Sequence, residues 1–141
     1  MSLVGVLVFF GADNSVAASS DGAVSFEGIK SEEDRIAFIE SFGLTVDKDS
    51  RTVTSFPMPK DFDRVIAGYN EIQKKQGLDL SKYARKKVTR YTYKVENYDY
   101  GGEVYATLFI YRSRIVACDL SSADPSGFVL PLTLVDPANI K

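Results

Sequence analysis

Histidine is absent from the 141-residue sequence. It is the commonest general base, a common metal ligand and the residue whose unperturbed pKa lies closest to neutral pH. Without it the chain has no Ser-His-Asp triad and no zinc site built on imidazole. A glycine-rich phosphate loop is missing too, because Gly101-Gly102 stands alone as a turn. The sequence therefore points to no metal site, no cofactor and no catalytic residue.

Cysteine occurs once, at Cys118, so no intrachain disulfide can form. The thiol lies in an apolar segment, and no histidine is present to activate it. We expect a small buried hydrophobic side chain there rather than a nucleophile.

Neither sign of charge dominates: the sequence has 17 Lys and Arg residues and 19 Asp and Glu residues, which gives a net charge of −2. This balance argues against nucleic acid, or an anionic membrane surface, as the main partner of the whole domain. A length of 141 residues with 45% hydrophobic residues is typical of one globular domain.

The apolar run Leu3–Phe10 is too short for a transmembrane helix, which needs about 20 residues. Three interpretations compete: the end of a membrane anchor or signal sequence, a strand of the domain, or a segment that a partner recognises. The small residues that follow favour the first, because Val16-Ala17-Ala18 resembles a signal-peptidase site. We predict that residues 1–25 are the remnant of an anchor or signal segment plus a linker, and that residues 26–141 form a single domain.

The stretch from Lys87 to Leu120 predicts a meander of three antiparallel strands. Its first segment alternates, with Tyr91 and Tyr93 on one face and Arg90 and Lys94 on the other. The second segment is apolar on both faces, which is typical of a strand in the middle of a covered sheet. The turn residues around Gly101-Gly102 join the two.

Two helices are expected. Residues 31–42 begin at Ser31, a good N-cap, and end before Gly43. Residues 61–76 form the stronger helix, which Gly77 closes. Its apolar positions recur at helical spacing and predict one buried stripe: Phe62, Val65, Ile66, Tyr69 and Ile72.

The remaining segments predict extended structure. Leu44–Val46 and Arg51–Met58 flank the polar turn Asp47–Ser50, which lacks the central glycine and distal glutamate of a calcium loop. Phe128–Val135 is expected to be a fourth strand, which Pro131 confines to an edge or a bulge. The fold class is therefore α+β, an antiparallel sheet of about four strands packed against two helices.

Four phrases carry a family resemblance: Arg35–Val46 (RIAFIESFGLTV), Pro59–Leu80 (PKDFDRVIAGYNEIQKKQGLDL), Tyr83–Tyr98 (YARKKVTRYTYKVENY) and Gly127-Phe128. Together they resemble a small family of uncharacterised domains of unknown function in predicted extracytoplasmic proteins of Gram-positive bacteria. The resemblance implies a short N-terminal membrane segment, a small-residue linker and then this domain. The sequence departs from the family at Ala117-Cys118, where small glycine-like residues are expected. The resemblance implies no activity, so no catalytic residue carries over.

Paired carboxylates are the one enzymatic option in the sequence. Glu96, Asp99, Glu103 and Asp119 could converge if the first hairpin curls over the third strand. A glycosidase needs two carboxyl groups about 5 to 10 Å apart beside a cleft. The alternative, which we favour, is that these acidic side chains are simply solvated.

Binding residues are suggested by two further features. Arg90 and Lys94 extend the basic segment Lys82–Lys87, which suits an anionic polymer or membrane headgroups, or is a solvated face. Tyr98 and Tyr100 lie in a turn, where they either contact a ligand or pack over the edge of the core.

We therefore predict a non-enzymatic extracytoplasmic binding or interaction module, membrane-anchored or secreted, whose ligand is a protein or a cell-envelope component. A small hydrolase using the hairpin carboxylates and a purely structural spacer are the alternatives. A cleft joining Asp99 or Glu103 to Asp119 would favour the hydrolase. A flat surface lined by tyrosines and without a pocket would favour the module.

Overall fold

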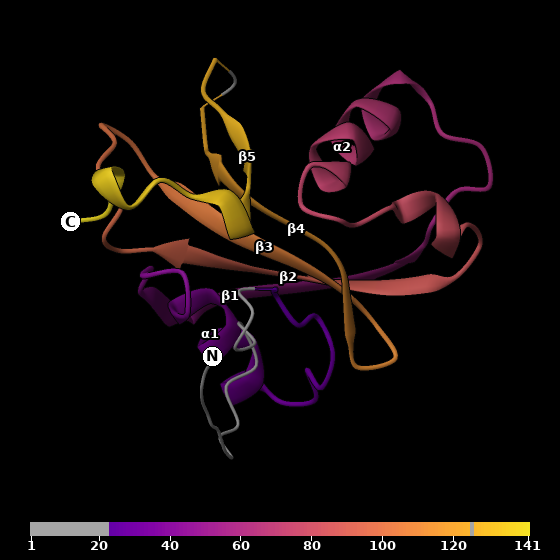
Figure 1. Ribbon diagram of the computed structural model, residues 1–141, viewed down its shortest axis with the longest axis horizontal. Helices are drawn as coiled ribbons and strands as arrows, with labels where there is room; N and C mark the ends of the chain where they lie inside the picture. The colour runs from indigo at the N-terminus through magenta and orange to yellow at the C-terminus, as the bar shows by residue number, and fades with distance from the viewer. Residues whose placement is uncertain (1–22, 125) are drawn as a thin grey trace, which may run out of the picture.

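The computed structural model describes residues 23–124 and 126–141 (Figure 1). Over this range the chain forms one five-stranded sheet in the order β1-β2-β3-β4-β5, with every neighbouring pair antiparallel. The strands are β1 (Val46–Pro57), β2 (Lys87–Val95), β3 (Val104–Tyr111), β4 (Arg114–Ser122) and β5 (Val129–Pro131). The helices are α1 (Glu32–Glu40) and α2 (Arg64–Lys74), with short 3-10 turns η1 (Leu80–Tyr83), η2 (Leu132–Leu134) and η3 (Pro137–Asn139).

The predicted α+β class and the meander of three strands are confirmed. The sheet has five strands rather than about four, because β1 is one continuous strand along β2. The expected polar turn at Asp47–Ser50 is wrong, since these residues form an irregularity within β1, between Asp47 and Thr52. The Ser50 hydroxyl accepts the N–H of Lys94 at 2.8 Å and so keeps this part of β1 attached to β2.

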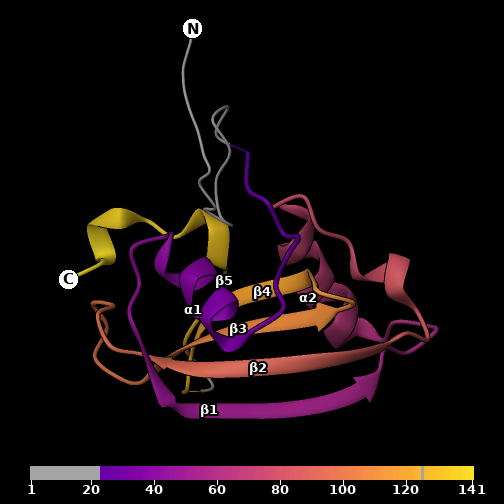
Figure 2. The ribbon, with the colours of Figure 1, turned by 90° about the horizontal axis from the view of Figure 1, so that it is seen from below.

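The two helices lie on opposite faces of the sheet (Figures 1 and 2). On one face, Phe38 and Ile39 of α1 are fully buried against side chains of β2, β3 and β4. Tyr93 is buried there as well, and its hydroxyl accepts a hydrogen bond from Arg35 Nε at 3.0 Å. On the other face, Tyr69 of α2 packs with a smaller cluster that includes Phe109 and Val116.

Local chemistry explains where α1 begins and ends. Ser31 and Asp34 form a capping box, in which each side chain accepts the other residue's backbone N–H. After the helix, Gly43 adopts φ +91°, a left-handed conformation that favours glycine. Both features were predicted from the sequence, and the helix lies within the predicted range.

The α2 helix lies within the predicted 61–76 range, but its buried face differs from the predicted apolar stripe. Val65 is 78% exposed, whereas Asn70 and Gln73 are buried. The side-chain oxygens of both residues accept backbone N–H groups: Asn70 Oδ1 from Leu80 at 2.7 Å, and Gln73 Oε1 from Cys118 at 2.8 Å. Just after the helix, Gln76 Nε2 donates to the Cys118 carbonyl at 2.8 Å. The helix is thus attached to β4 by polar side chains.

The C-terminal segment contains less strand than expected. Of the predicted strand Phe128–Val135, only Val129–Pro131 pairs with β4, and η2 follows at once. Cys118 is fully buried, as expected of a small hydrophobic side chain. Among the described residues no helix is both long and apolar enough to cross a bilayer. Leu3–Phe10 lies outside the described residues.

Candidate binding pocket

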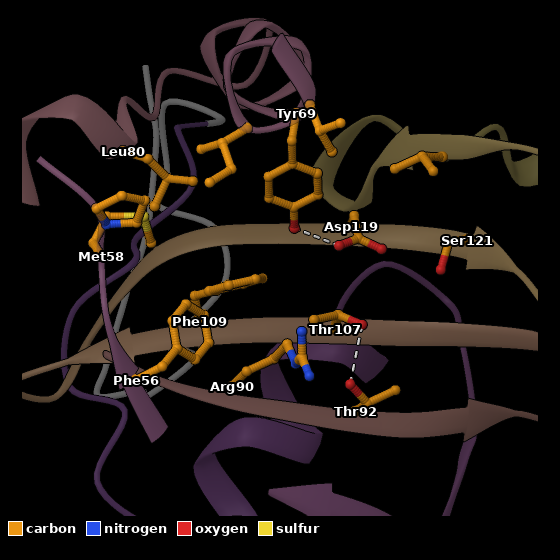
Figure 3. Close-up of a pocket in the computed structure, with 14 residues that line it drawn as sticks. Phe56, Met58, Tyr69, Leu80, Arg90, Thr92, Thr107, Phe109, Asp119 and Ser121 are labelled. Carbon is orange, nitrogen blue, oxygen red and sulfur yellow. Dashed lines mark hydrogen bonds between the residues drawn. The ribbon is translucent and has the colours of Figure 1, made fainter. Parts of the chain in front are cut away.

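A pocket of about 450 Å³ lies between α2 and the sheet, on the face opposite α1 (Figure 3). Fourteen residues line it: Phe56, Met58, Pro59, Val65, Ile66, Tyr69, Leu80, Arg90, Thr92, Thr107, Phe109, Asp119, Ser121 and Val129. Its volume falls within the range of about 300 to 1,000 Å³ that is usual for small-molecule sites.

A row of polar side chains crosses the floor of the pocket. Strand register places Thr92 of β2 opposite Thr107 of β3, and Thr107 opposite Asp119 of β4. The two threonine hydroxyls lie 3.3 Å apart. Arg90 and Ser121, two residues away on β2 and β4, line the pocket on either side of this row. Three neighbouring strands thus direct hydrogen-bonding groups into one space, because alternate residues share a face.

The rest of the lining is apolar and aromatic. The rings of Phe56 and Phe109 meet edge to face with centroids 6.0 Å apart, and Tyr69 lies 5.6 Å from Phe109. Met58 and Leu80 are both almost fully buried beside them. Figure 3 shows Phe56, Met58, Leu80 and Phe109 toward one end of the pocket and Asp119 and Ser121 toward the other. The pocket therefore has an apolar end and a polar end.

Asp119 is the one carboxylic acid in this lining. It is only 5% exposed and accepts a hydrogen bond from the Tyr69 hydroxyl of α2. Burial raises the pKa of Asp119 from its usual 3.8 to about 6, although hydrogen bonds from Tyr69 and Ser121 oppose that rise. Burial also raises the pKa of Tyr69 well above its usual value, so its hydroxyl keeps its proton at neutral pH.

The structure does not bring the predicted binding residues together. Arg90 lines the pocket, but Lys94 forms a salt bridge with Glu103 at 3.4 Å. Tyr98 and Tyr100 pack against Phe128, with ring centroids 5.6 and 5.0 Å away, as part of the cluster on the α1 face. The two tyrosines thus pack over the edge of the core, which was the alternative to ligand contact.

The hairpin carboxylates do not converge on Asp119. Glu96, Asp99 and Glu103 are exposed and absent from the pocket lining. Glu103 precedes the first residue of β3, four positions from Thr107, the partner of Asp119 in the sheet. Four residues of strand span about 13 Å, more than a pair of glycosidase carboxylates requires.

The basic segment Lys82–Lys87 lies at the start of β2 and in η1, outside the pocket lining. Its four charged side chains are exposed, and none forms a salt bridge with another described residue. Within the described ranges, no three His, Cys, Asp or Glu side chains are grouped so that they could hold a metal ion.

Sequence reasoning missed Tyr69, Thr92, Thr107 and Ser121 as pocket residues. Tyr69 was assigned to the buried stripe of a helix, where its ring does pack but its hydroxyl reaches Asp119. A usable signal was present at Thr107 and Asp119, two polar residues within strands that are otherwise buried. Buried polar residues are more informative than exposed apolar ones.

A family model described as a domain of unknown function (DUF4830) matches residues 38–120, which is more than half of the chain. The match runs from the end of α1 into β4 and includes the whole of α2 and the pocket residues Thr92, Thr107 and Asp119. Searches of curated proteins and of solved structures gave no match.

Proposed function

Because the chain belongs to the DUF4830 family of domains of unknown function, we propose a role that rests on its own pocket: it is a non-enzymatic binding module. The ligand, a protein segment or a cell-envelope component, occupies the space between α2 and the sheet. The observation that carries the proposal is the convergence of Thr92, Thr107 and Asp119, from three adjacent strands, on one largely apolar pocket.

A purely structural spacer would not need this arrangement. Burying a polar group costs free energy unless the group is satisfied, and packing normally fills interior space. Asp119 is kept in a buried position at the pocket wall, where its raised pKa shows that burial disfavours its charged form. Groups with perturbed pKa values are found at functional sites more often than elsewhere.

A hydrolase is the second candidate, and Asp119 is the observation in its favour. A carboxyl group with a pKa of about 6 in a pocket has the properties of a general acid or base. The lining, however, offers no second carboxylate, no thiol and no lysine. Its hydroxyl groups include those of Tyr69 and Ser121, which donate hydrogen bonds to Asp119. The pair of carboxylates that a glycosidase needs is therefore missing from this pocket. Binding without catalysis requires no such pair, and we prefer it.

We further propose that the domain is extracytoplasmic, in a Gram-positive bacterium, and is held by a membrane anchor or secreted, with no nucleic-acid partner. The support is the apolar run Leu3–Phe10, the small residues after it and the family resemblance described above. A fusion of the full-length native gene to alkaline phosphatase, which folds only outside the cytoplasm, tests this location. Strong phosphatase activity is expected, and activity no higher than that of a cytoplasmic control fusion would contradict it.

A thermal-shift screen against peptides, glycans, wall polymers and lipids tests binding. A ligand at about 100 times its Kd stabilises the native state by about 2.7 kcal/mol, which raises the Tm by several degrees. The matched variants are Thr92→Trp, which fills the pocket, and Ser55→Trp, on an exposed part of β1. We expect Thr92→Trp to abolish the shift and Ser55→Trp to leave it unchanged. A shift that survives in both would place binding elsewhere and refute the proposal.

A further inference from the structure

Two opposite charges line the same pocket. Arg90 enters from β2 and Asp119 from β4, with β3 between them (Figure 3). Strand register sets Arg90 opposite Phe109, and Asp119 opposite Thr107, two residues along β3. Two strand spacings across and two residues along the sheet separate the two Cα atoms by about 12 Å. From this separation both charged side chains can reach a small molecule that is held between them.

Neither charge is paired in a salt bridge within the described residues, although the positive charge of Arg90 acts on Asp119 from a distance and opposes the rise of its pKa. The hydrogen-bond donors to Asp119, Tyr69 and Ser121, are uncharged. The Arg90 guanidinium lies 5.8 Å from the ring centre of Phe56, with its side chain exposed at the pocket. The site therefore offers one cation and one anion to a ligand.

The space beyond these charges is apolar. Met58, Leu80 and Phe109 are buried and form a wall that offers a ligand no hydrogen-bonding side-chain group. A sugar would satisfy the charged groups but leave this wall without apolar contact. A fatty acid would match the wall and Arg90, but it carries no cation for Asp119, which would stay unpaired beside a second negative charge.

We propose that the pocket binds an α-amino acid or a short peptide with both termini free and an apolar side chain. The ligand carboxylate accepts two hydrogen bonds from the Arg90 guanidinium. The ligand ammonium group lies against Asp119, and the ligand side chain enters the apolar end. This inference rests on the proposed function and narrows the ligand to a small zwitterion, such as a released fragment of a protein or envelope peptide.

Calorimetric titration with three probes tests it: the dipeptide Leu-Phe, its N-acetyl derivative and its C-terminal amide. The first carries both charges, and each derivative lacks one. We expect the free dipeptide to bind about tenfold to a hundredfold more tightly than either derivative, because each lost contact is a charge-assisted hydrogen bond. A wider set of apolar amino acids and dipeptides, tested at millimolar concentration, covers differences in side-chain fit.

Variants assign each charge to its residue. Arg90→Met is expected to remove the preference for the free carboxylate while keeping the preference for the free ammonium, and Asp119→Asn the reverse. Lys94→Met is the matched control, since Lys94 lies on the same strand, carries the same charge and is outside the pocket lining. Arg90→Lys keeps the charge without the planar fork and should bind with intermediate affinity. Circular dichroism and the Tm of each variant verify that it folds.

The outcomes separate this inference from the proposed function. If the blocked derivatives bind as well as the free dipeptide, or no apolar zwitterion binds to the wild type at millimolar concentration, the inference is overturned. The proposed function still stands in those cases if another compound of the thermal-shift screen binds and Thr92→Trp prevents it. Binding of the dipeptide that persists in Thr92→Trp overturns both.

Discussion

At the scale of single residues, Asp119 both connects the sheet to α2 and lines the pocket. Its carboxyl group is buried in β4 and held by the Tyr69 hydroxyl of α2. The same group faces the pocket, where a ligand can reach it. A charge in this position destabilises the native state unless something compensates for the lost solvation.

Stability should therefore depend on pH through Asp119. A pKa of about 6 in the native state against 3.8 in the unfolded state means that the native state holds the proton more tightly. The stabilising contribution is fully present below about pH 4 and is lost as the pH rises through about 6. The shift corresponds to about 3 kcal/mol.

The measurement compares the free energy of unfolding of the wild type and of Asp119→Asn in urea from about pH 4 to about pH 7. We expect the wild type to lose about 2.5 kcal/mol relative to the variant over this range, most of the full effect. Carboxylates with lowered pKa values, such as Asp79 and Asp34, act in the opposite direction but cancel in the difference. A difference that stays constant with pH would contradict a buried, raised-pKa carboxyl group.

At the scale of the elements, α2 forms the roof of the pocket. It begins at the N-cap Asp63, whose side chain accepts the N–H of Ile66 at 2.9 Å. It is attached to β4 by Gln73 and Gln76, and to the segment after it by Asn70, whose Oδ1 accepts the N–H of Leu80 at 2.7 Å. These polar attachments set how far the helix stands from the sheet, and hence the height of the pocket.

Alanine substitutions at two glycines test where α2 ends, because we expect them to change the stability of the protein in opposite directions. Gly68 is within α2, and a Cβ added there meets nothing within 4 Å. Gly77, after the helix, has equal space but adopts φ +85°. We expect Gly68→Ala to stabilise the protein by about 0.5 to 1 kcal/mol, because alanine favours a helix interior. We expect Gly77→Ala to destabilise it by about 1 kcal/mol, because an L residue is strained at that φ.

Urea denaturation of the two variants measures both effects as changes in midpoint at constant slope. Since space is not limiting at either glycine, the two variants differ in backbone conformation alone. A shift of both midpoints in the same direction would contradict the helix boundary between residues 68 and 77.

The sequence predicts the elements well wherever their local chemistry is strong. The capping box at Ser31, the glycine after α1 and the alternation in β2 each specify an element from a few residues. The edge strand β1 was harder, because its central residues Thr52–Ser55 are all exposed and show no inward-facing apolar period.

The candidate site is less accessible to sequence reasoning. The pocket depends on strand register, which sets Thr92, Thr107 and Asp119 in one row although they are far apart in the chain. It also depends on helix rotation: an apolar period predicts that Val65 is buried, while the structure buries Asn70 and Gln73 instead. Amide side chains bonded to backbone groups leave no hydrophobic pattern to read.

At the scale of the whole molecule, the sheet separates two unequal sides. The α1 side is a larger, filled core that contains Tyr93, Phe38 and Leu108. The α2 side has a smaller cluster and a hollow lined by polar and apolar groups. Figure 1 shows the two helices on opposite sides of the sheet, so we expect a ligand on the α2 side to leave the main core undisturbed. This division assigns stability to one face and binding to the other.

Mapping of backbone amide chemical shifts in the ¹⁵N-labelled protein tests this division most directly. The probe is the tightest-binding compound of the thermal-shift screen. We predict that its addition shifts the amides of the floor residues Thr92, Thr107 and Asp119 and leaves those of Tyr98 and Tyr100 unchanged. Shifts confined to the two tyrosines or to the basic segment Lys82–Lys87, with the floor residues unaffected, would contradict the account.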